Sequence, residues 1–159
     1  MMLRESVRLA REEQRVVVFV EPIALYPMRD LHADKDGGWM RTYPAPDQSI
    51  ALGEVGQHGA GTDLAIVTYG NGRYLSTQAQ AELEARGIKT RIIDLRWLAP
   101  LPAEALLEAT KSCKHVLIVD ECRTTGSQSE ALMALFTEAS DRPAARIAAE
   151  DCFIATGPA

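Results

Sequence analysis

A continuous apolar run at residues 64–67 constrains the fold of this chain more than any other stretch. Its residues, Leu-Ala-Ile-Val, do not alternate with polar ones, which is typical of a parallel strand covered on both faces. The turn Gly70-Asn71-Gly72 follows, and a helical pattern begins directly after it. Strand, glycine turn and helix make up the first half of a βαβ unit, so we expect a parallel sheet flanked by helices.

The same pattern recurs along the rest of the chain. Further strands are predicted at residues 91–96, 114–121 and 146–149, with helical spacings of Leu and Ala between them. Ser127 and Glu130 have the spacing of a capping box, so we expect the last helix to begin there. The sequence therefore predicts an α/β fold with right-handed crossovers between parallel strands.

The N-terminal part does not continue this alternation. Residues 2–13 predict an amphipathic helix, and residues 15–20 predict a short strand that Pro22 ends. One helix and one strand cannot bury their own apolar faces. We therefore expect residues 1–26 to be the remnant of a preceding domain.

A long irregular stretch follows at residues 27–49, which we predict to be a linker strap pinned by Trp39 and Tyr43. The main domain is then expected at residues 50–159. Four residues of the strap have side chains that can bind metals, but they lack the spacing of calcium or zinc loops, so we favour a solvated polar loop. These residues are Asp30, His32, Asp34 and Asp36.

Composition excludes some classes of function. The chain has 159 residues, with 17 Lys and Arg against 22 Asp and Glu, and the net charge of −5 argues against nucleic acid as a partner. No stretch is long and apolar enough to predict a membrane span. The three cysteines lack the spacing of a zinc site, and their odd number argues against a disulfide framework. Free thiols of this kind favour a cytoplasmic location.

The turn at residues 70–72 could serve either of two purposes. Glycines between a strand and a helix can present backbone amides to a phosphate group. A dinucleotide fingerprint needs a third glycine where this chain has Leu75, so we favour a turn that only needs small residues. The three histidines, His32, His58 and His115, fall in no Ser-His-Asp or metal arrangement.

Polar residues gather where the predicted strands end. That edge is where open α/β sheets bind ligands or partners. Adjacent residues on a strand point to opposite faces, so Asp120 and Glu121 make a poor acid–base pair. We therefore favour an interface or capping role for this edge over catalysis.

A series of short motifs follows in a fairly specific order: residues 63–70, Gly87-Ile88, residues 93–96 with Pro100-Leu101, Val119-Asp120-Glu121, and Gly126. Together they resemble the transketolase C-terminal domain family. They are most like the version in the beta subunit, or beta half, of the decarboxylating component of 2-oxo acid dehydrogenase complexes. Residues 19–26 resemble the end of the preceding pyrimidine-binding domain. Residues 151–154 resemble the exit from the family's last strand, although Ala155 stands in place of proline.

The resemblance implies a three-layer αβα fold, with a mostly parallel five-stranded sheet and residues 50–58 as its one antiparallel strand. In the family, the chemistry belongs to thiamine diphosphate and Mg held by a Gly-Asp-Gly motif in another domain, which Asp36-Gly37-Gly38 does not match. The activating glutamate also lies upstream. We therefore assign no catalytic, cofactor-binding or metal-binding residue to this chain.

Such a domain is expected to support a homo-oligomer and contact other domains or subunits of the same enzyme. It also helps to dock the lipoyl acyltransferase core through that core's small basic domain, which the acidic charge suits. The family's usual closing helix after Gly157-Pro158 is absent from the sequence, so we expect the chain to be a fragment. Because the resemblance places the catalytic parts in other domains, we expect this fragment to be inactive alone. The candidate residues for the inter-domain or subunit interface are Asp94, Arg96, Asp120, Glu121 and Arg123.

Two other functions stay open from the sequence. The chain could be a free-standing interaction module that dimerises through a sheet edge and binds a basic partner. It could also be a small nucleotide-binding oxidoreductase that uses the turn at residues 70–72.

Overall fold

The five strands form one sheet in the order β1-β3-β2-β4-β5 in a computed structural model that describes residues 1–153. The end of the expected strand exit, at Ile154, and the run Gly157-Pro158 lie outside the described residues. Strands β2 to β5 are parallel, and β1 runs antiparallel to β3 at one edge. The strands are β1 Gly56–His58, β2 Leu64–Thr68, β3 Thr90–Asp94, β4 His115–Arg123 and β5 Ala144–Ala149.

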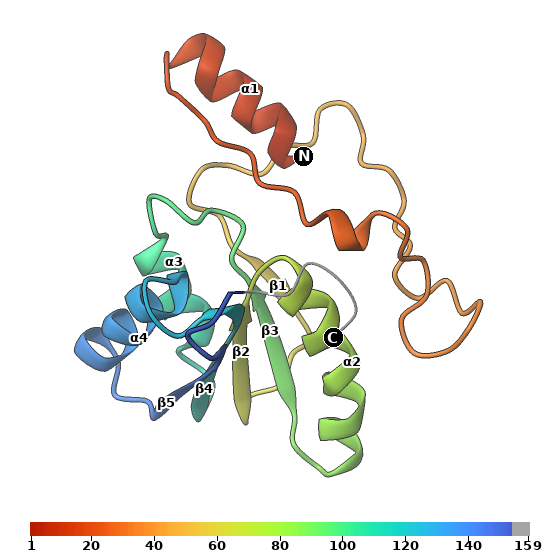
Figure 1. The fold of residues 1–159 in the computed structure, drawn as a ribbon, viewed down its shortest axis with the longest axis vertical. Helices are drawn as coiled ribbons and strands as arrows, with labels where there is room; N and C mark the ends of the chain where they lie inside the picture. Colours follow the sequence, from red (N-terminus) through yellow and green to blue (C-terminus); the bar gives the residue numbers. More distant parts are fainter. Residues whose placement is uncertain (154–159) are drawn as a thin grey trace.

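Helices cover both faces of this sheet (Figure 1). Helix α2, Asn71–Ala85, lies on one face, and helices α3, Ala103–Thr110, and α4, Gln128–Ala139, lie on the other. Side chains from alternate strand positions pack against α3 and α4 around the fully buried Phe136. These layers confirm the predicted three-layer α/β fold, and β1 confirms the antiparallel strand within residues 50–58.

The N-terminus of α4 differs from the predicted capping box. The Ser127 hydroxyl lies 2.7 Å from the Ser129 hydroxyl and makes no capping hydrogen bond. The amide of Ser129 instead donates to the Asp120 carboxylate at 3.1 Å, and the Glu130 carboxylate accepts from the Gly126 amide at 2.8 Å. The prediction is therefore wrong in its capping group, because the Asp120 carboxylate of β4, and not the Ser127 hydroxyl, accepts from an amide of the first turn.

The N-terminal segment has the predicted helix but not the predicted strand. Helix α1 spans Met2–Glu12, whereas residues 15–20 form no strand. Val16, Val18 and Val20 are 96%, 83% and 71% exposed. A strand needs a neighbour to pair with its amides and carbonyls, and no other part of residues 1–153 pairs with this one. The strand predicted at residues 15–20 is wrong for that reason.

The strap at residues 27–49 is irregular and packs on the outer side of α2. The ring of Trp39 meets that of Tyr74 edge-on at 5.0 Å, and the Tyr74 hydroxyl donates to the carbonyl of Asp30 at 3.0 Å. Trp39 therefore anchors the strap as expected. Tyr43 does not, since it is 84% exposed and only the Arg4 guanidinium lies over its ring.

The acidic residues of the strap bind its own backbone. Asp36 accepts hydrogen bonds from the amides of Leu31, His32, Ala33 and Gly38, which hold the pKa of its carboxyl well below its usual range. Asp30 accepts two more, from Lys35 and Gly37. No group of three metal-binding side chains is present among residues 1–153. No helix in that part of the chain is both long and apolar enough to cross a bilayer.

Candidate functional site

The carboxyl ends of β2, β3 and β4 lie at one edge of the sheet because these strands are parallel. Helix α2 leaves this edge over one face and α4 over the other, so the strands separate the first turns of the two helices. The predicted interface residues all lie near this edge, but the structure divides them into three groups. Asp94 and Arg96 form one, Asp120 and Glu121 a second, and Arg123 a third.

The second group is built around the buried carboxylate of Asp120. One of its oxygens accepts from the Tyr69 hydroxyl at 2.8 Å and from the Cys122 amide at 2.9 Å. The other accepts from the Ser129 amide at 3.1 Å. Asp120 therefore joins the end of β2 to the first turn of α4 through its own position on β4.

Burial opposes ionisation of Asp120, but the hydrogen bonds to its carboxylate outweigh burial and place its pKa below the ordinary value. Burial raises the pKa of Tyr69 well above its usual range, and its bond to Asp120 raises it further. A neutral phenol therefore donates to a charged carboxylate. The Tyr69 hydroxyl also contacts the Cys122 sulfur at 3.7 Å, and together these bonds join β2, β4 and the first turn of α4, which gives the cluster a structural role.

The neighbouring Glu121 points away from Asp120, as the alternation of a strand requires. Its carboxylate accepts from the Asn71 side chain at 3.1 Å and lies at the surface. Arg123 lines a shallow surface hollow near the end of β5, together with Thr125, Gly126, Asp151, Cys152 and Phe153. Asp120 and Glu121 thus contact different partners, which agrees with the expectation that they do not form an acid–base pair.

The turn at residues 70–72 is explained by packing. Gly70 has a φ of +55°, which favours glycine. A Cβ on Gly72 would lie 2.2 Å from the Thr68 hydroxyl oxygen, so α2 can start this close to β2 only without a side chain there. Both observations favour the small-residue turn over a dinucleotide fingerprint.

The first group, Asp94 and Arg96, is joined by two residues that the sequence analysis did not select for a site, Arg73 and His58. The carboxylate of Asp94 lies 3.6 Å from the Nε atoms of both Arg73 and Arg96. Arg73 Nε also donates to His58 Nε2 at 3.2 Å, and its guanidinium lies 4.6 Å from the centre of the Trp39 ring. Burial lowers the pKa of His58, and the charge of Arg73 lowers it further. No local motif marks the contact between Arg73 and His58, because it depends on β1 pairing with β3.

The residues present do not fit thiamine diphosphate with Mg. The Asp36 carboxylate, in the run Asp36-Gly37-Gly38 that does not match the family's Gly-Asp-Gly motif, is already bonded by four backbone amides. Within residues 1–153 no other acidic cluster offers the oxygen ligands that Mg requires.

Comparison with known proteins agrees with this architecture. Residues 53–159 match the family described as "Transketolase, C-terminal domain". A solved structure described as a split-gene transketolase, an inactive beta4 tetramer, has a TM-score of 0.62 and 26% identity; the match covers 71% of this chain and 38% of that one.

Two relatives come from Bacillus subtilis (strain 168). The 2-oxoisovalerate dehydrogenase subunit beta is 33% identical over 112 residues, which are 68% of this chain and 34% of the relative. The pyruvate dehydrogenase E1 component subunit beta is 27% identical over 139 residues, which are 85% of this chain and 40% of the relative. The chain thus spans between a third and two fifths of the length of these relatives.

A parallel sheet with one antiparallel edge strand, covered by helices on both faces, defines the class as an α/β domain. With more than half of its length matched, the chain belongs to the transketolase C-terminal domain family. The predicted resemblance is confirmed, and curated relatives include beta subunits of 2-oxo acid dehydrogenases.

Proposed function

We propose that the chain is the C-terminal structural and assembly domain of the beta part of a thiamine-diphosphate-dependent 2-oxo acid dehydrogenase. The family match over residues 53–159 carries this proposal. The two beta subunits from Bacillus subtilis support the choice of enzyme. Because the chain spans only 34% and 40% of those relatives, we assign the decarboxylation chemistry to the remaining length of such an enzyme.

The domain division proposed from the sequence gains support from the extent of similarity. One relative aligns over 85% of this chain, more than residues 53–159 can supply, so the similarity reaches into the first 52 residues. We assign residues 1–26 to the preceding domain, residues 27–49 to the linking strap and residues 50–159 to the C-terminal domain. The exposed valines at residues 16–20 fit a segment whose neighbours belong to another part of the enzyme.

Inactivity of the chain alone is tested by isothermal titration calorimetry with thiamine diphosphate and Mg. We expect no binding heat, because the Asp36 carboxylate is fully engaged by its own loop. An affinity in the micromolar range would contradict the proposal. The result concerns the cofactor alone and does not bear on docking.

Docking to a lipoyl acyltransferase core is proposed from charge. The net charge of −5 complements a small basic subunit-binding domain, and complementary charge steers association. Titration with such a domain should show binding that weakens as NaCl rises from about 50 to about 300 mM, because salt screens surface charges. Absence of binding at the lower salt would contradict docking through this chain.

Assembly and location complete the proposal. The similar split-gene transketolase is described as a beta4 tetramer, which supports a homo-oligomer here, and light scattering after gel filtration tests it. The free cysteines Cys113, Cys122 and Cys152 suit the reducing cytoplasm.

A second candidate function is a free-standing interaction module. The exposed apolar segment at residues 16–20 favours it, since such a segment can pair with a partner without any catalysis. The reading frame upstream of Met1 distinguishes the two functions. Thiamine-binding domains encoded there in frame support the dehydrogenase, and their absence supports the module.

A further inference from the structure

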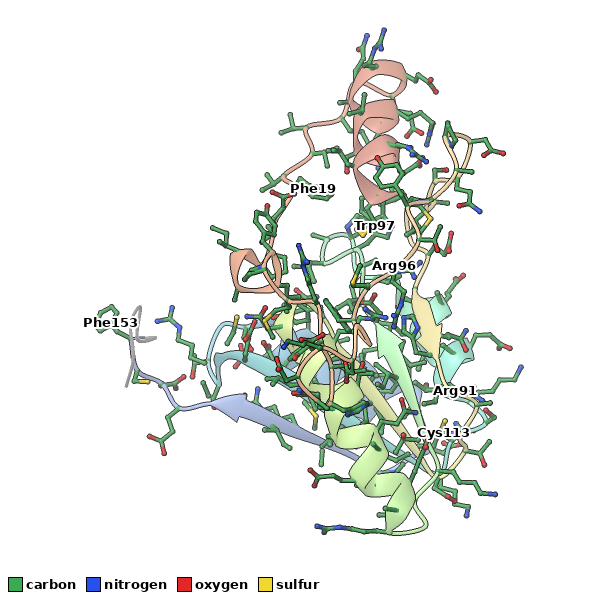
Figure 2. The ribbon with its side chains drawn as sticks, turned by 90° about the vertical axis from the view of Figure 1, so that its right-hand side faces the viewer. Phe19, Arg91, Arg96, Trp97, Cys113 and Phe153 are labelled. Carbon is green, nitrogen blue, oxygen red and sulfur yellow. The ribbon has the colours of Figure 1, made fainter. Side chains whose placement is uncertain are left out.

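Three arginines gather at the carboxyl edge of the sheet in an otherwise acidic chain. Arg41 comes from the strap, Arg73 from the first turn of α2, and Arg96 from the segment after β3. The guanidinium groups of Arg41 and Arg73 lie 6.0 Å and 4.6 Å from the centre of the same Trp39 ring. The charges of Arg41 and Arg96 lower the pKa of Arg73, although burial is the larger cause. We call these residues, with His58 and Asp94, the arginine cluster. Figure 2 shows Arg96 between the sheet and the N-terminal segment.

The negative charges nearby do not balance this cluster. Asp94 is shared between Arg73 and Arg96, at 3.6 Å from each, which is beyond ordinary hydrogen-bond length. Glu54 lies 3.5 Å from Arg96, but its side chain is 51% exposed. Two carboxylates therefore face three guanidinium groups. The first turn of α2, which has no side-chain cap, adds the positive end of the helix dipole.

Most N–H donors of Arg73 and Arg96 make no hydrogen bond within the described part of the chain. Within residues 1–153, Arg73 donates only through Nε, to His58, so its two terminal nitrogens have no hydrogen-bond partner there. Among the same residues, Arg96 makes a single hydrogen bond, at 3.5 Å to Glu54. An arginine has five N–H donors. The side chains of Arg73 and Arg96 are 18% and 19% exposed, so solvent reaches only part of them.

Packing also fixes the direction of these groups. The Arg73 guanidinium stacks over Trp39 at 4.6 Å. The Arg96 guanidinium lies flat against Gly56, where a Cβ would come within 2.7 Å of Nη2. Immobilised guanidinium planes lose little entropy when they bind, and their paired donors match the oxygens of a phosphate.

We propose that the arginine cluster is a binding site for phosphate, either free or as the monoester of a small molecule. The free donors of Arg73 and Arg96 would bind its oxygens, and Arg41 would add charge from the strap. Asp94 then competes with the ligand for the same two arginines. Binding would also link the strap to α2 and β3, because the three arginines come from these separate segments.

The test is calorimetric titration of the 159-residue chain with inorganic phosphate and, separately, with methyl phosphate, against chloride at equal ionic strength. A second measurement, thermal unfolding, is made at a phosphate concentration about ten times the dissociation constant. There the melting temperature should rise by roughly 3–6 °C. Tighter binding of methyl phosphate identifies a monoester as the ligand, and equal or weaker binding identifies free phosphate. If phosphate binds no better than chloride, the proposal is wrong.

Variants separate a binding site from a structural ion network. Arg96→Gln should lose phosphate binding by tenfold or more, whereas Arg86→Gln, at the exposed far end of α2, should keep it. Asp94→Asn is the decisive variant, because removing the competing carboxylate should tighten phosphate binding about threefold or more. A purely structural network predicts instead that Asp94→Asn only lowers the melting temperature and leaves phosphate without effect, which would overturn the proposal.

Discussion

At the scale of single residues, Asp120 connects β2, β4 and α4 at the carboxyl edge of the sheet. Its side chain is buried, with the residue only 4% exposed, and it accepts from one hydroxyl and two amides. Asp120→Ala leaves those donors buried without a partner, so we expect the free energy of unfolding to fall by about 2–4 kcal/mol. Urea denaturation measures this loss in the free energy of unfolding. Asp141→Ala, at an exposed position, is the control, and an equally small effect of both variants would contradict this account.

The bond from Tyr69 to Asp120 also predicts a dependence on pH. The pKa of Tyr69 is raised in the folded chain above the ordinary tyrosine pKa of about 10. The stability that its neutral phenol contributes is therefore fully present below about pH 10 and is lost as the pH rises further. Tyr69→Phe should cost about 1 kcal/mol at pH 7. That deficit should shrink above pH 10, by up to about 1.4 kcal/mol per pH unit, because the phenylalanine cannot ionise.

Unfolding measured between pH 7 and 11 gives this comparison. Tyr43→Phe serves as the control, since the Tyr43 ring is 84% exposed. A deficit for Tyr69→Phe that stays constant up to pH 11 would show that the phenol is not held neutral by the fold.

At the scale of secondary-structure elements, the approach of α2 to β2 depends on Gly72. A Cβ there would lie 2.2 Å from the Thr68 hydroxyl oxygen, in a site where Thr68 is fully buried. Gly72→Ala should therefore lower the free energy of unfolding by about 1–3 kcal/mol, despite the better helix propensity of alanine.

A second substitution tests the cause of that loss. The Thr68 hydroxyl makes no hydrogen bond with any other of residues 1–153, so Thr68→Ala removes the obstacle without breaking a bond. The double variant should be more stable than Gly72→Ala alone in thermal unfolding. If the two losses simply add, the collision with Thr68 is not the reason for glycine at this position.

The elements that the sequence predicted well are those with local signals. The apolar run of β2 marks its position by pattern alone, and β2 lies where expected, whereas α2 begins at Asn71, within the predicted turn. The strand at residues 15–20 failed because pairing is not local, and five apolar residues carry no information about a neighbour. The contact between His58 and Arg73 was missed for the same reason, since it depends on the register of His58 against Ile92.

At the scale of the whole molecule, exposed apolar side chains concentrate in the N-terminal part. Leu3, Val7, Val16, Val18 and Val20 are between 48% and 96% exposed, whereas the sheet core is nearly closed to solvent. Figure 1 shows α1 and the following extended segment projecting from the sheet and its helices. Apolar surface of this kind drives association, because burying it removes it from water.

Substituting Val16, Val18 and Val20 together by lysine should therefore reduce self-association of the chain. The melting temperature should change little, because these side chains are mostly exposed in the folded chain. Light scattering after gel filtration measures the mass across a range of concentrations, and Val67→Thr in the core is the contrasting variant that should instead lower the melting temperature. An unchanged mass for the lysine variant would place any self-association on another surface, with the sheet edge at β5 the next to test by substituting the 58% exposed Ile147.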